Sequence, residues 1–575
     1  MERNMARSGG RLLIEALEEQ GVERAFCVPG ESYLEALDAL KDSKIRLIVA
    51  RQEGGAAMMA EAEGKMSGRP GICFVTRGPG ATNASAGVHV ARQDSTPMIL
   101  FVGQVERAHL GREAFQEADM AAFFGPLAKW AATIPSADRI PEYVSRAFHV
   151  AMSGRPGPVV LALPEDMLVD PTEAAAPRRV EAPEQTPSVA QIEWVRRLLS
   201  ISRRPTLIAG GSRWTPEAVR ALRAISERWM LPVACSFRRQ GLFDNQHPLY
   251  AGHLGLGLDG ALRRRVEASD LVILLGGRFS EIPSQGYELL KVPSPDQRLI
   301  HIHPDPDELG RVYAPNLPIC ATPGGFLGAL HDAEGPPSTP VWAAEAAQPH
   351  AAYEIWSALP ETTPGPLTME ALMAHLRETA PNDAITTNGA GNYAAWLHRH
   401  WRWRRYGTQV APTSGSMGYG LPAAIAAKLR HPKREALCFA GDGCWQMTMQ
   451  ELGTAAQEGA AVLALICDNG QYGTIRMHQE RAHPGRQSGT ALRNPDFAAI
   501  AQAYGVFGRR VERNEDLPEA LAAARAATAE GRPAVLHLIL DPEAISPGRR
   551  LEPAAEAAAE ARPEGSAPDA EPESL

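Results

Sequence analysis

The sequence predicts an α/β protein with three parallel-sheet α/β domains. Short apolar segments that end in Gly, Pro or Asp, such as "GICFVT", "LVILLG" and "LCFAGD", alternate with helical patterns along the whole chain. Repeated βα units imply parallel sheets covered by helices on both faces. Pro-, Ala- and Glu-rich stretches at 171–190 and 334–350 interrupt this alternation and are typical of linkers. A chain of 575 residues also has the length of about three domains.

These interruptions predict the domain boundaries. We expect a first domain at 1–172, a central domain at 190–333, a third domain at 364–546 and a disordered acidic tail at 551–575. The first and third domains each contain a "CF" strand that leads into a glycine loop, and each ends in a similar strand ("GRPGPVVLALPEDM" and "GRPAVLHLILDPEA"). This similarity predicts a duplicated domain with a different one between, although chance similarity between two parallel strands is the alternative.

Composition excludes several classes of function. The formal net charge of -9 argues against a surface for nucleic acid. The seven cysteines are scattered, odd in number and without a C-x-x-C pair, which indicates reduced thiols. No apolar run reaches the roughly 18 residues of a membrane span. The sequence therefore predicts a cytoplasmic protein that acts on small molecules, with no nucleic acid or membrane partner.

One glycine loop, in "LCFAGDGCWQM" at 437–447, stands between an apolar strand and a helical pattern. Asp442 in this loop and Asn469 after the next strand are 27 residues apart, close to one βαβ unit. Both are therefore expected at the carboxyl edge of one parallel sheet, where α/β proteins bind ligands. Their oxygens suit Mg²⁺, and the glycines leave N–H groups for a phosphate. The alternative is a plain turn, with Asp as N-cap and Asn as turn residue.

The segment "GDGCWQMTMQELGTAAQEGAAVLALICDNGQ" resembles the thiamine diphosphate motif. The resemblance implies that Asp442, Asn469 and the backbone carbonyl of Gln471 hold Mg²⁺, which anchors the diphosphate. Two further segments, "GAGNYAAW" and "TSGSMGYGLPAAIAAK", are similar to other cofactor-contacting segments of this family. The remaining contacts with thiamine diphosphate that the resemblance implies are Gly391, Asn392, Tyr393, Gly415, Met417, Gly443 and Cys444. Without it, Met417 would be assigned to core packing.

A glutamate begins a helix in "RLIVARQEGGAAMMAEAEG". From the residues alone, Glu53 either stabilises the helix dipole or, among small and apolar neighbours, shares a proton with a heterocyclic nitrogen. The family uses such a glutamate to activate thiamine through its pyrimidine ring. In this architecture the glutamate comes from a pyrimidine-binding first domain, and the third, diphosphate-binding domain of another subunit completes the site. The resemblance thus implies a homodimer at least, commonly a tetramer.

The chain is most similar to acetolactate (acetohydroxyacid) synthases, over about residues 8 to 545. By this resemblance Phe115 and Gln116 line the substrate channel, and Gln104 lies near the cofactor. The central segment "LLGGRFSE" resembles a region that binds FAD in some members, but it lacks the aspartate usual after Arg-Phe, which makes FAD doubtful.

Three positions depart from the synthases. Glu31 replaces a glycine, Glu165 replaces a lysine of the channel, and His478 replaces a substrate-selecting tryptophan. The substrate pocket is therefore expected to be more polar and more acidic. Glu31 and His478 are candidates for proton transfer after decarboxylation. The alternatives are a helix N-cap neighbour for Glu31 and a surface helix residue for His478.

The sequence thus favours a thiamine-dependent enzyme that decarboxylates a pyruvate-like 2-oxo acid and joins the two-carbon unit to a second carbonyl compound. A simple 2-oxo acid decarboxylase or a C–C lyase of the same family is the alternative within the class. An NAD- or FAD-dependent oxidoreductase is disfavoured because no strand is followed by G-x-G-x-x-G. A catalytically inactive regulatory relative is disfavoured by the joint presence of Glu53, Asp442 and Asn469.

Overall fold

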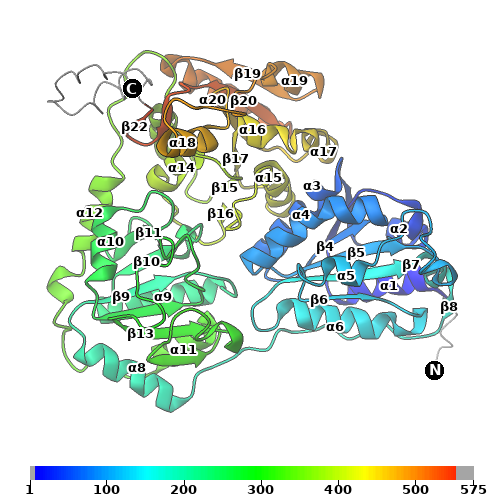
Figure 1. Ribbon diagram of the computed structural model, residues 1–575, viewed down its shortest axis with the longest axis horizontal. Helices are drawn as coiled ribbons and strands as arrows, with labels where there is room; N and C mark the ends of the chain where they lie inside the picture. Colours follow the sequence, from blue (N-terminus) through cyan, green and yellow to red (C-terminus); the bar gives the residue numbers. More distant parts are fainter. Residues whose placement is uncertain (1–6, 552–575) are drawn as a thin grey trace, which may run out of the picture.

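The computed structural model describes residues 7–551. It contains three six-stranded sheets in which all neighbouring strands are parallel, each covered by helices (Figure 1). The fold class predicted from the alternation of apolar and helical segments is confirmed. The tail predicted at 551–575 lies outside the described residues except for its first residue. The exact domain boundaries stay a prediction.

The first sheet has the strand order β3-β2-β4-β5-β7-β6. Its strands are β2 (Arg24–Cys27), β3 (Arg46–Val49), β4 (Gly71–Val75), β5 (Met98–Gln104), β6 (Trp130–Thr133) and β7 (Pro158–Pro164). Its helices are α1 (Gly9–Glu19), α2 (Leu34–Lys41), α3 (Glu53–Ser67), α4 (Gly78–Asp94), α5 (Met120–Phe124), α6 (Ile140–Met152) and α7 (Glu165–Val169). The short strands β1 (Arg7–Ser8) and β8 (Pro171–Thr172) pair antiparallel beside it.

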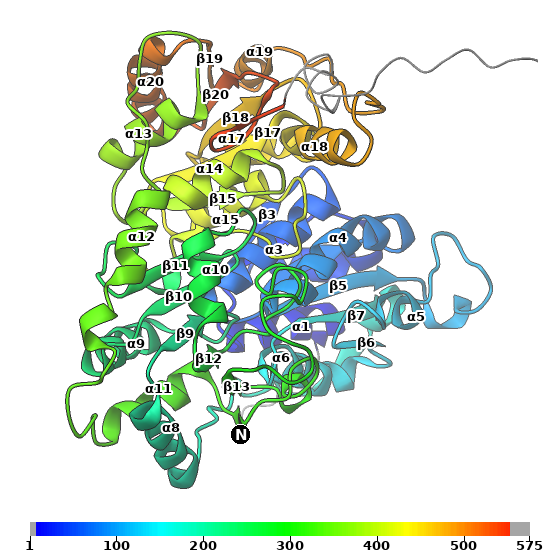
Figure 2. The ribbon, with the colours of Figure 1, turned by 60° about the vertical axis from the view of Figure 1, so that its left-hand side comes forward.

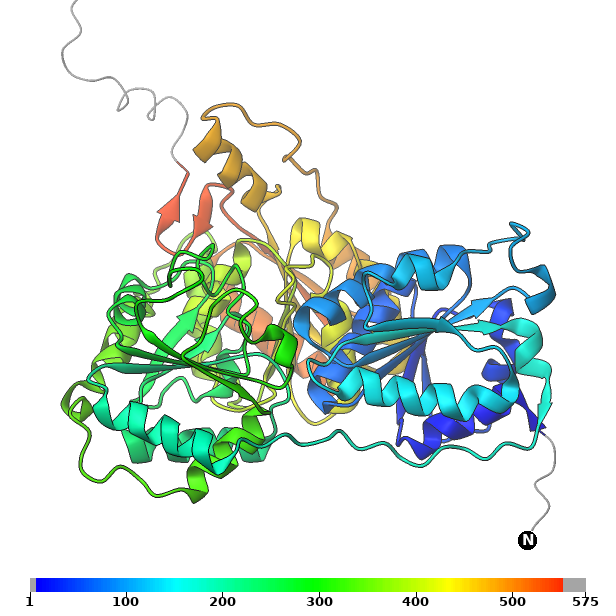
Figure 3. The ribbon, with the colours of Figure 1, turned by 60° about the horizontal axis from the view of Figure 1, so that its bottom comes forward.

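The central sheet has the order β11-β10-β9-β12-β13-β14. Its strands are β9 (Pro205–Ala209), β10 (Val233–Ser236), β11 (Tyr250–Leu254), β12 (Leu271–Leu275), β13 (Arg298–His303) and β14 (Leu317–Cys320). The helices are α8 (Val189–Ile201), α9 (Pro216–Trp229), α10 (Gly260–Glu267), α11 (Pro323–Asp332) and α12 (Gln348–Trp356). Figure 3 shows the long extended connection that joins the first domain to this one.

The third sheet has the order β16-β15-β17-β18-β20-β19. Its strands are β15 (Ile385–Asn388), β16 (Gln409–Val410), β17 (Ala436–Gly441), β18 (Leu463–Asp468), β19 (Phe507–Val511) and β20 (Ala534–Ile539), followed by the hairpin β21 (Ala544–Ser546) and β22 (Arg549–Arg550). The helices are α13 (Met369–Thr379), α14 (Tyr393–His400), α15 (Gly420–Arg430), α16 (Asp442–Gln446), α17 (Leu452–Glu458), α18 (Gly473–Ala482), α19 (Phe497–Ala503) and α20 (Leu517–Ala529).

The strand orders support the duplication. When strands are numbered from the first of each sheet, the first and third sheets both run 2-1-3-4-6-5, whereas the central sheet runs 3-2-1-4-5-6. Two unrelated strands can look alike by chance, but the shared order extends over six strands. The first and third domains therefore have one topology, and the central domain has another.

The small residues of "EGGAAMMAEAEG" fit the position of α3. This helix packs between α4 and α15, so it joins the first domain to the third within one chain (Figure 2). Every residue from Gly54 to Gly64 is buried. A Cβ added at Gly87 of α4 would lie 2.4 Å from the Cβ of Ala57, which is closer than two carbon atoms can approach. Glycine and alanine are thus required where these helices touch.

A buried carboxylate of the third domain holds the segment just before α3. Both carboxylate oxygens of Glu451 accept from the backbone N–H of Arg51 at 3.2 Å, and Thr454 donates its hydroxyl to Oε2 at 2.7 Å. Burial raises the pKa of Glu451. Arg51 also donates to Gln457 at 2.8 Å. The start of α3, where Glu53 lies, is therefore fixed by contacts with the third domain of its own chain.

Among residues 7–551, no helix has both the length and the apolar character needed to cross a lipid bilayer. The cytoplasmic location stays a prediction.

Candidate active site

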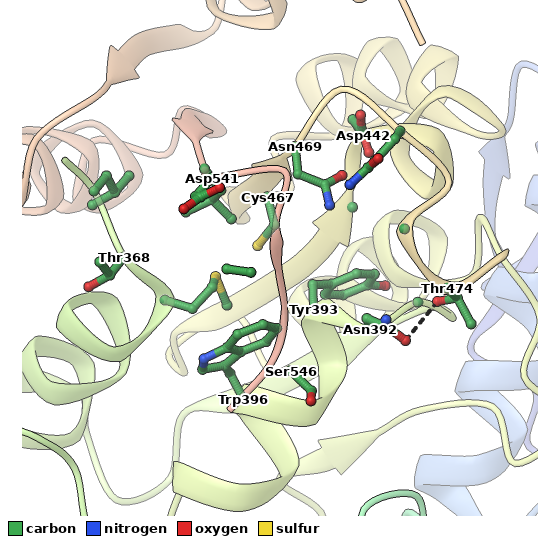
Figure 4. A pocket seen from close by; sticks show the side chains of 18 of the residues that line it. Thr368, Asn392, Tyr393, Trp396, Asp442, Cys467, Asn469, Thr474, Asp541 and Ser546 are labelled. Atoms are coloured by element: carbon green, nitrogen blue, oxygen red, sulfur yellow. Dashed lines mark hydrogen bonds between the residues drawn. The ribbon is translucent and has the colours of Figure 1, made fainter. Parts of the chain in front are cut away.

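A cavity of about 780 Å³ opens at the carboxyl edge of the third sheet. It is lined by residues that follow β15, β17 and β18, together with the segment before α13 and the β21–β22 hairpin (Figure 4). All of the contacts predicted for the third domain line it: Gly391, Asn392, Tyr393, Gly415, Met417, Asp442, Gly443, Cys444, Asn469 and Gln471. Segments that lie far apart in the sequence are thus brought to one cavity.

Asp442 lies at the base of this cavity and is 3% exposed. Asn494 donates its amide to Oδ2 of Asp442 at 2.7 Å and to Oδ1 of Asp468 at 2.8 Å. Burial raises the pKa of Asp442 to about 6, and the nearby Asp468 adds to the rise, while Asn494 opposes it. His537 lies 2.7 Å from the other oxygen of Asp468. Two carboxylates thus share one largely buried pocket, and a cation beside Asp442 would favour its ionised form.

The other two predicted ligands are arranged differently from one another. Asn469 follows β18, and its side chain lies in the cavity near Asp442 (Figure 4). The side chain of Gln471 turns away, because it donates to the carbonyl of Pro542 and accepts from Arg476. Its backbone carbonyl accepts from Gly473 N–H at 2.9 Å, which leaves a second lone pair. One carboxylate, one amide oxygen and one carbonyl form an oxygen donor set that fits Mg²⁺.

The glycines of the cavity allow close approach of backbone and aromatic rings. A Cβ at Gly443 would lie 2.4 Å from a ring carbon of Tyr472. Gly391 has φ +144°, and a Cβ there would meet the ring of Tyr393 at 2.8 Å. Residues with larger side chains would therefore displace both rings and close part of the cavity.

Tyr393 and Cys444 form a wall of the cavity through contacts with each other. The Tyr393 hydroxyl accepts from Gly389 N–H at 3.0 Å and donates to Sγ of Cys444 at 3.4 Å. Gly418 N–H also donates to this sulfur, at 3.2 Å. The Tyr393 hydroxyl and the Cys444 sulfur are thus used in bonds between three loops. The polar groups left to contact a ligand here are those of Asn392 and the backbone. Asn392 itself accepts from the Thr474 hydroxyl at 2.9 Å (Figure 4).

The helical pattern after the Gly-Asp-Gly loop is interrupted in the structure. The helix α16 has only five residues, and a short 3-10 turn (Met449–Glu451) separates it from α17. A helix this short has a weak dipole, so the N–H groups of the loop are the main attraction for a phosphate.

Several residues of the cavity were not foreseen from the sequence. They come from the start of α13, from α14, from α18 and from the segment and hairpin after β20, and include Thr368, Trp396, Thr474, Asp541, Ser546, Arg549 and Arg550. The paired arginines in "PGRRL" were a signal, because cationic side chains near a diphosphate site are expected to contribute to its field. Their place over the cavity depends on the hairpin, which the sequence did not reveal.

Glu53 belongs to a different surface. It begins α3 after β3, and its Oε2 accepts from the Asn83 amide at 2.9 Å. A Cβ at Gly80, in the first turn of α4, would lie 3.5 Å from its Oε1. Within the part of the chain that the structure describes, Glu53 does not line the 780 Å³ cavity, whose walls come from residues 363–550 alone. One chain therefore holds two separated halves of the expected site.

Other predicted residues gather on the same edge as Glu53. Glu31 and Glu165 both approach the guanidinium of Arg77, at 3.6 Å and 3.1 Å. The carbonyl of Gln116 accepts from Gly78 N–H at 2.9 Å, and its side-chain Oε1 is buried without a hydrogen-bond partner among the described residues. Gln104 bonds the carbonyl of Ala118 and the N–H of Val105 within its own domain.

His478 does not join either half in the single chain. It lies on α18, and its Nδ1 accepts from Arg481 at 2.7 Å. It does not line the 780 Å³ cavity of residues 363–550. Its role in proton transfer stays a prediction.

A second cavity, of about 370 Å³, lies between α4 and the central domain. It is lined by the glycine turns after β9 and β12, and by Arg278 and Phe279 of the "GGRFSE" segment. The segment that resembles an FAD-binding region of some family members therefore lines this second cavity.

Comparisons with known proteins agree with the geometry. Three family models match the chain: the N-terminal TPP binding domain of thiamine pyrophosphate enzymes at residues 7–123, their central domain at 192–330 and their C-terminal TPP binding domain at 389–538. The chain is 33% identical over 536 residues to an acetolactate synthase of Mycobacterium bovis, covering 90% of this chain and 86% of that protein.

Two further relatives come from other organisms. The chain is 30% identical to the acetolactate synthase isozyme 2 large subunit of Escherichia coli, covering 89% of this chain and 92% of that protein. It is 31% identical to the mitochondrial acetolactate synthase catalytic subunit of Saccharomyces cerevisiae, with 89% and 78% covered.

Proposed function

Because the chain belongs to the thiamine pyrophosphate enzyme family, we propose that it decarboxylates a pyruvate-like 2-oxo acid and transfers the two-carbon unit to a second carbonyl compound. The observation that carries this proposal is the cavity that Asp442, Asn469 and Gln471 line together. The acetolactate synthases among its relatives support the same reaction class. The cofactor is thiamine diphosphate, the diphosphate ester also called thiamine pyrophosphate.

The residues of the cavity and those around Glu53 have distinct proposed roles. Asp442, Asn469 and the Gln471 carbonyl would hold Mg²⁺ against the diphosphate, and Asn392 and the loop N–H groups would bind its oxygens. Met417 and Gly415 would support the middle of the cofactor. When bound, the thiazolium ring supplies an electron sink for the electrons left by decarboxylation. Glu53 would hold the proton that the pyrimidine ring needs for activation, and Asn83 would orient its carboxylate.

We also propose that active sites form between subunits. Glu53 and the cavity lie apart in one chain, and apolar side chains are exposed beside both halves: Leu34 and Phe115 on the first domain, and Met447 and Ile475 on the third. Exposed apolar surface of this kind is typical of an interface. A homodimer in which the first domain of one subunit covers the cavity of the other would bury it; a tetramer would be two such dimers.

Alternative functions make different predictions. A simple decarboxylase would release CO₂ and a free aldehyde, and a C–C lyase would cleave an acyloin rather than form one. An inactive relative has no chemical need for Glu53, Asp442 and Asn469 together. A flavin in the second cavity is not required for the proposed reaction, and the visible absorbance of the purified protein tests for one.

Incubation with thiamine diphosphate, Mg²⁺ and a panel of 2-oxo acids tests the proposed function. We expect CO₂ from pyruvate or a close homologue, and an acyloin or acetohydroxy acid when a second carbonyl compound is present. Release of CO₂ without any carboligation product would favour the decarboxylase. No CO₂ from any 2-oxo acid would exclude the proposal.

A further inference from the structure

A three-charge cluster lies at the carboxyl edge of the first sheet. Its members are Arg77 after β4, Glu31 after β2 and Glu165 after β7, here called the Arg77 cluster. Arg77 is largely buried, at 8% exposed. Its Nη2 lies 3.1 Å from Glu165 Oε2 and 3.6 Å from Glu31 Oε1. With both carboxylates ionised, the cluster carries one net negative charge.

The cluster lies beside the carboxylate of Glu53. Thr76 precedes Arg77, and its hydroxyl is 2.9 Å from that of Ser32, which follows Glu31. A Cβ at Gly80 would meet Thr76 Cγ2 at 2.9 Å and Glu53 Oε1 at 3.5 Å. One short turn therefore separates Glu53 from the Arg77 cluster. If Glu53 contacts the cofactor, as the proposed function requires, the cluster borders the same active site, where a substrate can reach it.

The hydrogen-bonding groups left open here are mainly acceptors. Glu31 uses one oxygen on Arg77 and its side chain is 59% exposed, and Glu165 likewise uses one oxygen. Gln116 adds a buried Oε1 without a partner in the described structure, and its backbone has the strained φ of +62°. Within the described cluster, the buried donor that lacks a partner is Nε of Arg77. This set suits a ligand that donates hydrogen bonds, and its negative charge disfavours a second carboxylate.

We propose that the Arg77 cluster selects a neutral hydroxyaldehyde as the acceptor, in place of a second 2-oxo acid. This proposal rests on the proposed function, because the cluster matters only where a two-carbon unit is transferred. Pyruvate loses CO₂, its C2 bonds to the carbonyl carbon of the aldehyde, and the aldehyde oxygen takes up one proton. The hydroxyl group of the aldehyde donates a hydrogen bond to Glu165 or Gln116, while Arg77 holds the carboxylates of Glu31 and Glu165 in place.

Competition between acceptors tests the proposal. With pyruvate as donor, glycolaldehyde and acetaldehyde are supplied at equal concentration. The carboligation products of glycolaldehyde, of acetaldehyde (acetoin) and of a second pyruvate (acetolactate) are quantified together with CO₂. Acetaldehyde is the matched probe because it lacks only the hydroxyl. We expect the glycolaldehyde product to exceed acetoin by about 10- to 100-fold, the usual effect of a hydrogen bond to a charged group, and acetolactate to be the minor product.

Charge-changing variants give the decisive comparison. Glu165→Gln neutralises the cluster, so the ratio of glycolaldehyde product to acetolactate should fall at least about tenfold. Arg77→Gln leaves the cluster with two negative charges, which disfavour a second carboxylate further, so the ratio of glycolaldehyde product to acetolactate should rise. Glu142→Gln, on the exposed face of α6, is the control and should leave it unchanged. Product ratios are measured within one active enzyme, so a loss of folded protein does not alter them.

The outcomes separate the two proposals. CO₂ release with equal yields from glycolaldehyde and acetaldehyde overturns the role of the cluster and leaves the proposed function standing. A shift of the product ratio in the same direction by Glu165→Gln and Arg77→Gln also overturns that role. No CO₂ from any 2-oxo acid overturns both proposals.

Discussion

Glu53→Gln is expected to lower kcat by about 10²- to 10⁴-fold, the usual contribution of a positioned acid or base. Glutamine keeps the shape of the side chain and its contact with Asn83, but it cannot exchange a proton with the cofactor. Thiamine diphosphate should still bind, because the cavity of residues 363–550 does not depend on Glu53. The measurement is CO₂ release under saturating thiamine diphosphate and Mg²⁺, alongside cofactor titration.

Two further variants sharpen this result. Glu142→Gln removes an exposed carboxylate from the same domain and should be fully active. Asn83→Ala leaves the Glu53 carboxylate in place without its amide partner, so it should cause a smaller loss of kcat. Wild-type CO₂ release by Glu53→Gln would rule out the proton-holding role of Glu53.

Asp442→Ala is expected to abolish binding of thiamine diphosphate in the presence of Mg²⁺. It removes the one carboxylate of the donor set, and the remaining amide and carbonyl oxygens carry no net charge to hold a divalent ion. Trp396 lines the cavity, so quenching of tryptophan fluorescence during titration with cofactor and Mg²⁺ reports binding. Undiminished affinity would show that the metal lies elsewhere.

Asn494→Ala is expected to weaken cofactor binding less than Asp442→Ala does. Asn494 bonds both Asp442 and Asp468 without being a ligand itself. Loss of such a supporting contact typically costs about 10- to 100-fold in metal affinity. Asp332→Ala, at an exposed helix end in the central domain, should bind the cofactor normally. The affinities should therefore fall in the order wild type, Asn494→Ala, Asp442→Ala.

The fold and the meeting of Asp442 with Asn469 could be predicted from the residues because their signals are local, whereas the other contacts of the third domain were implied by the family resemblance. Strands buried on both faces read as continuous apolar runs, and residues that follow adjacent parallel strands meet at one edge. Asp442 and Asn469 follow β17 and β18, which are neighbours both in sequence and in the sheet. Sequence spacing alone therefore placed them together.

Contacts that span the chain could not be predicted in this way. Arg77 meets Glu165 across 88 residues because β7 pairs with β5, which in turn pairs with β4. Asn494 reaches Asp442 from the loop before α19, 52 residues later. Neither contact has a periodic signal. The resemblance assigns His478 to the substrate pocket; in the single chain it lies beside Arg481 on α18, and its place in the pocket stays a prediction.

In the proposed dimer, the contact of Glu451 with Arg51 holds the two half-sites of one chain apart, so that each half-site would complete a different active site. Two chains that are each inactive, one carrying Glu53→Gln and the other Asp442→Ala, should then regain activity when unfolded together and refolded as a mixture. Random pairing in a dimer makes half of the molecules mixed, and each of these has one intact centre, so about one quarter of wild-type activity should return. In the proposed dimer, a chain with one defective half-site would still contribute its intact half-site to the other active site. Complementation between two defective chains therefore follows from the contact that anchors α3 to the third domain of its own chain.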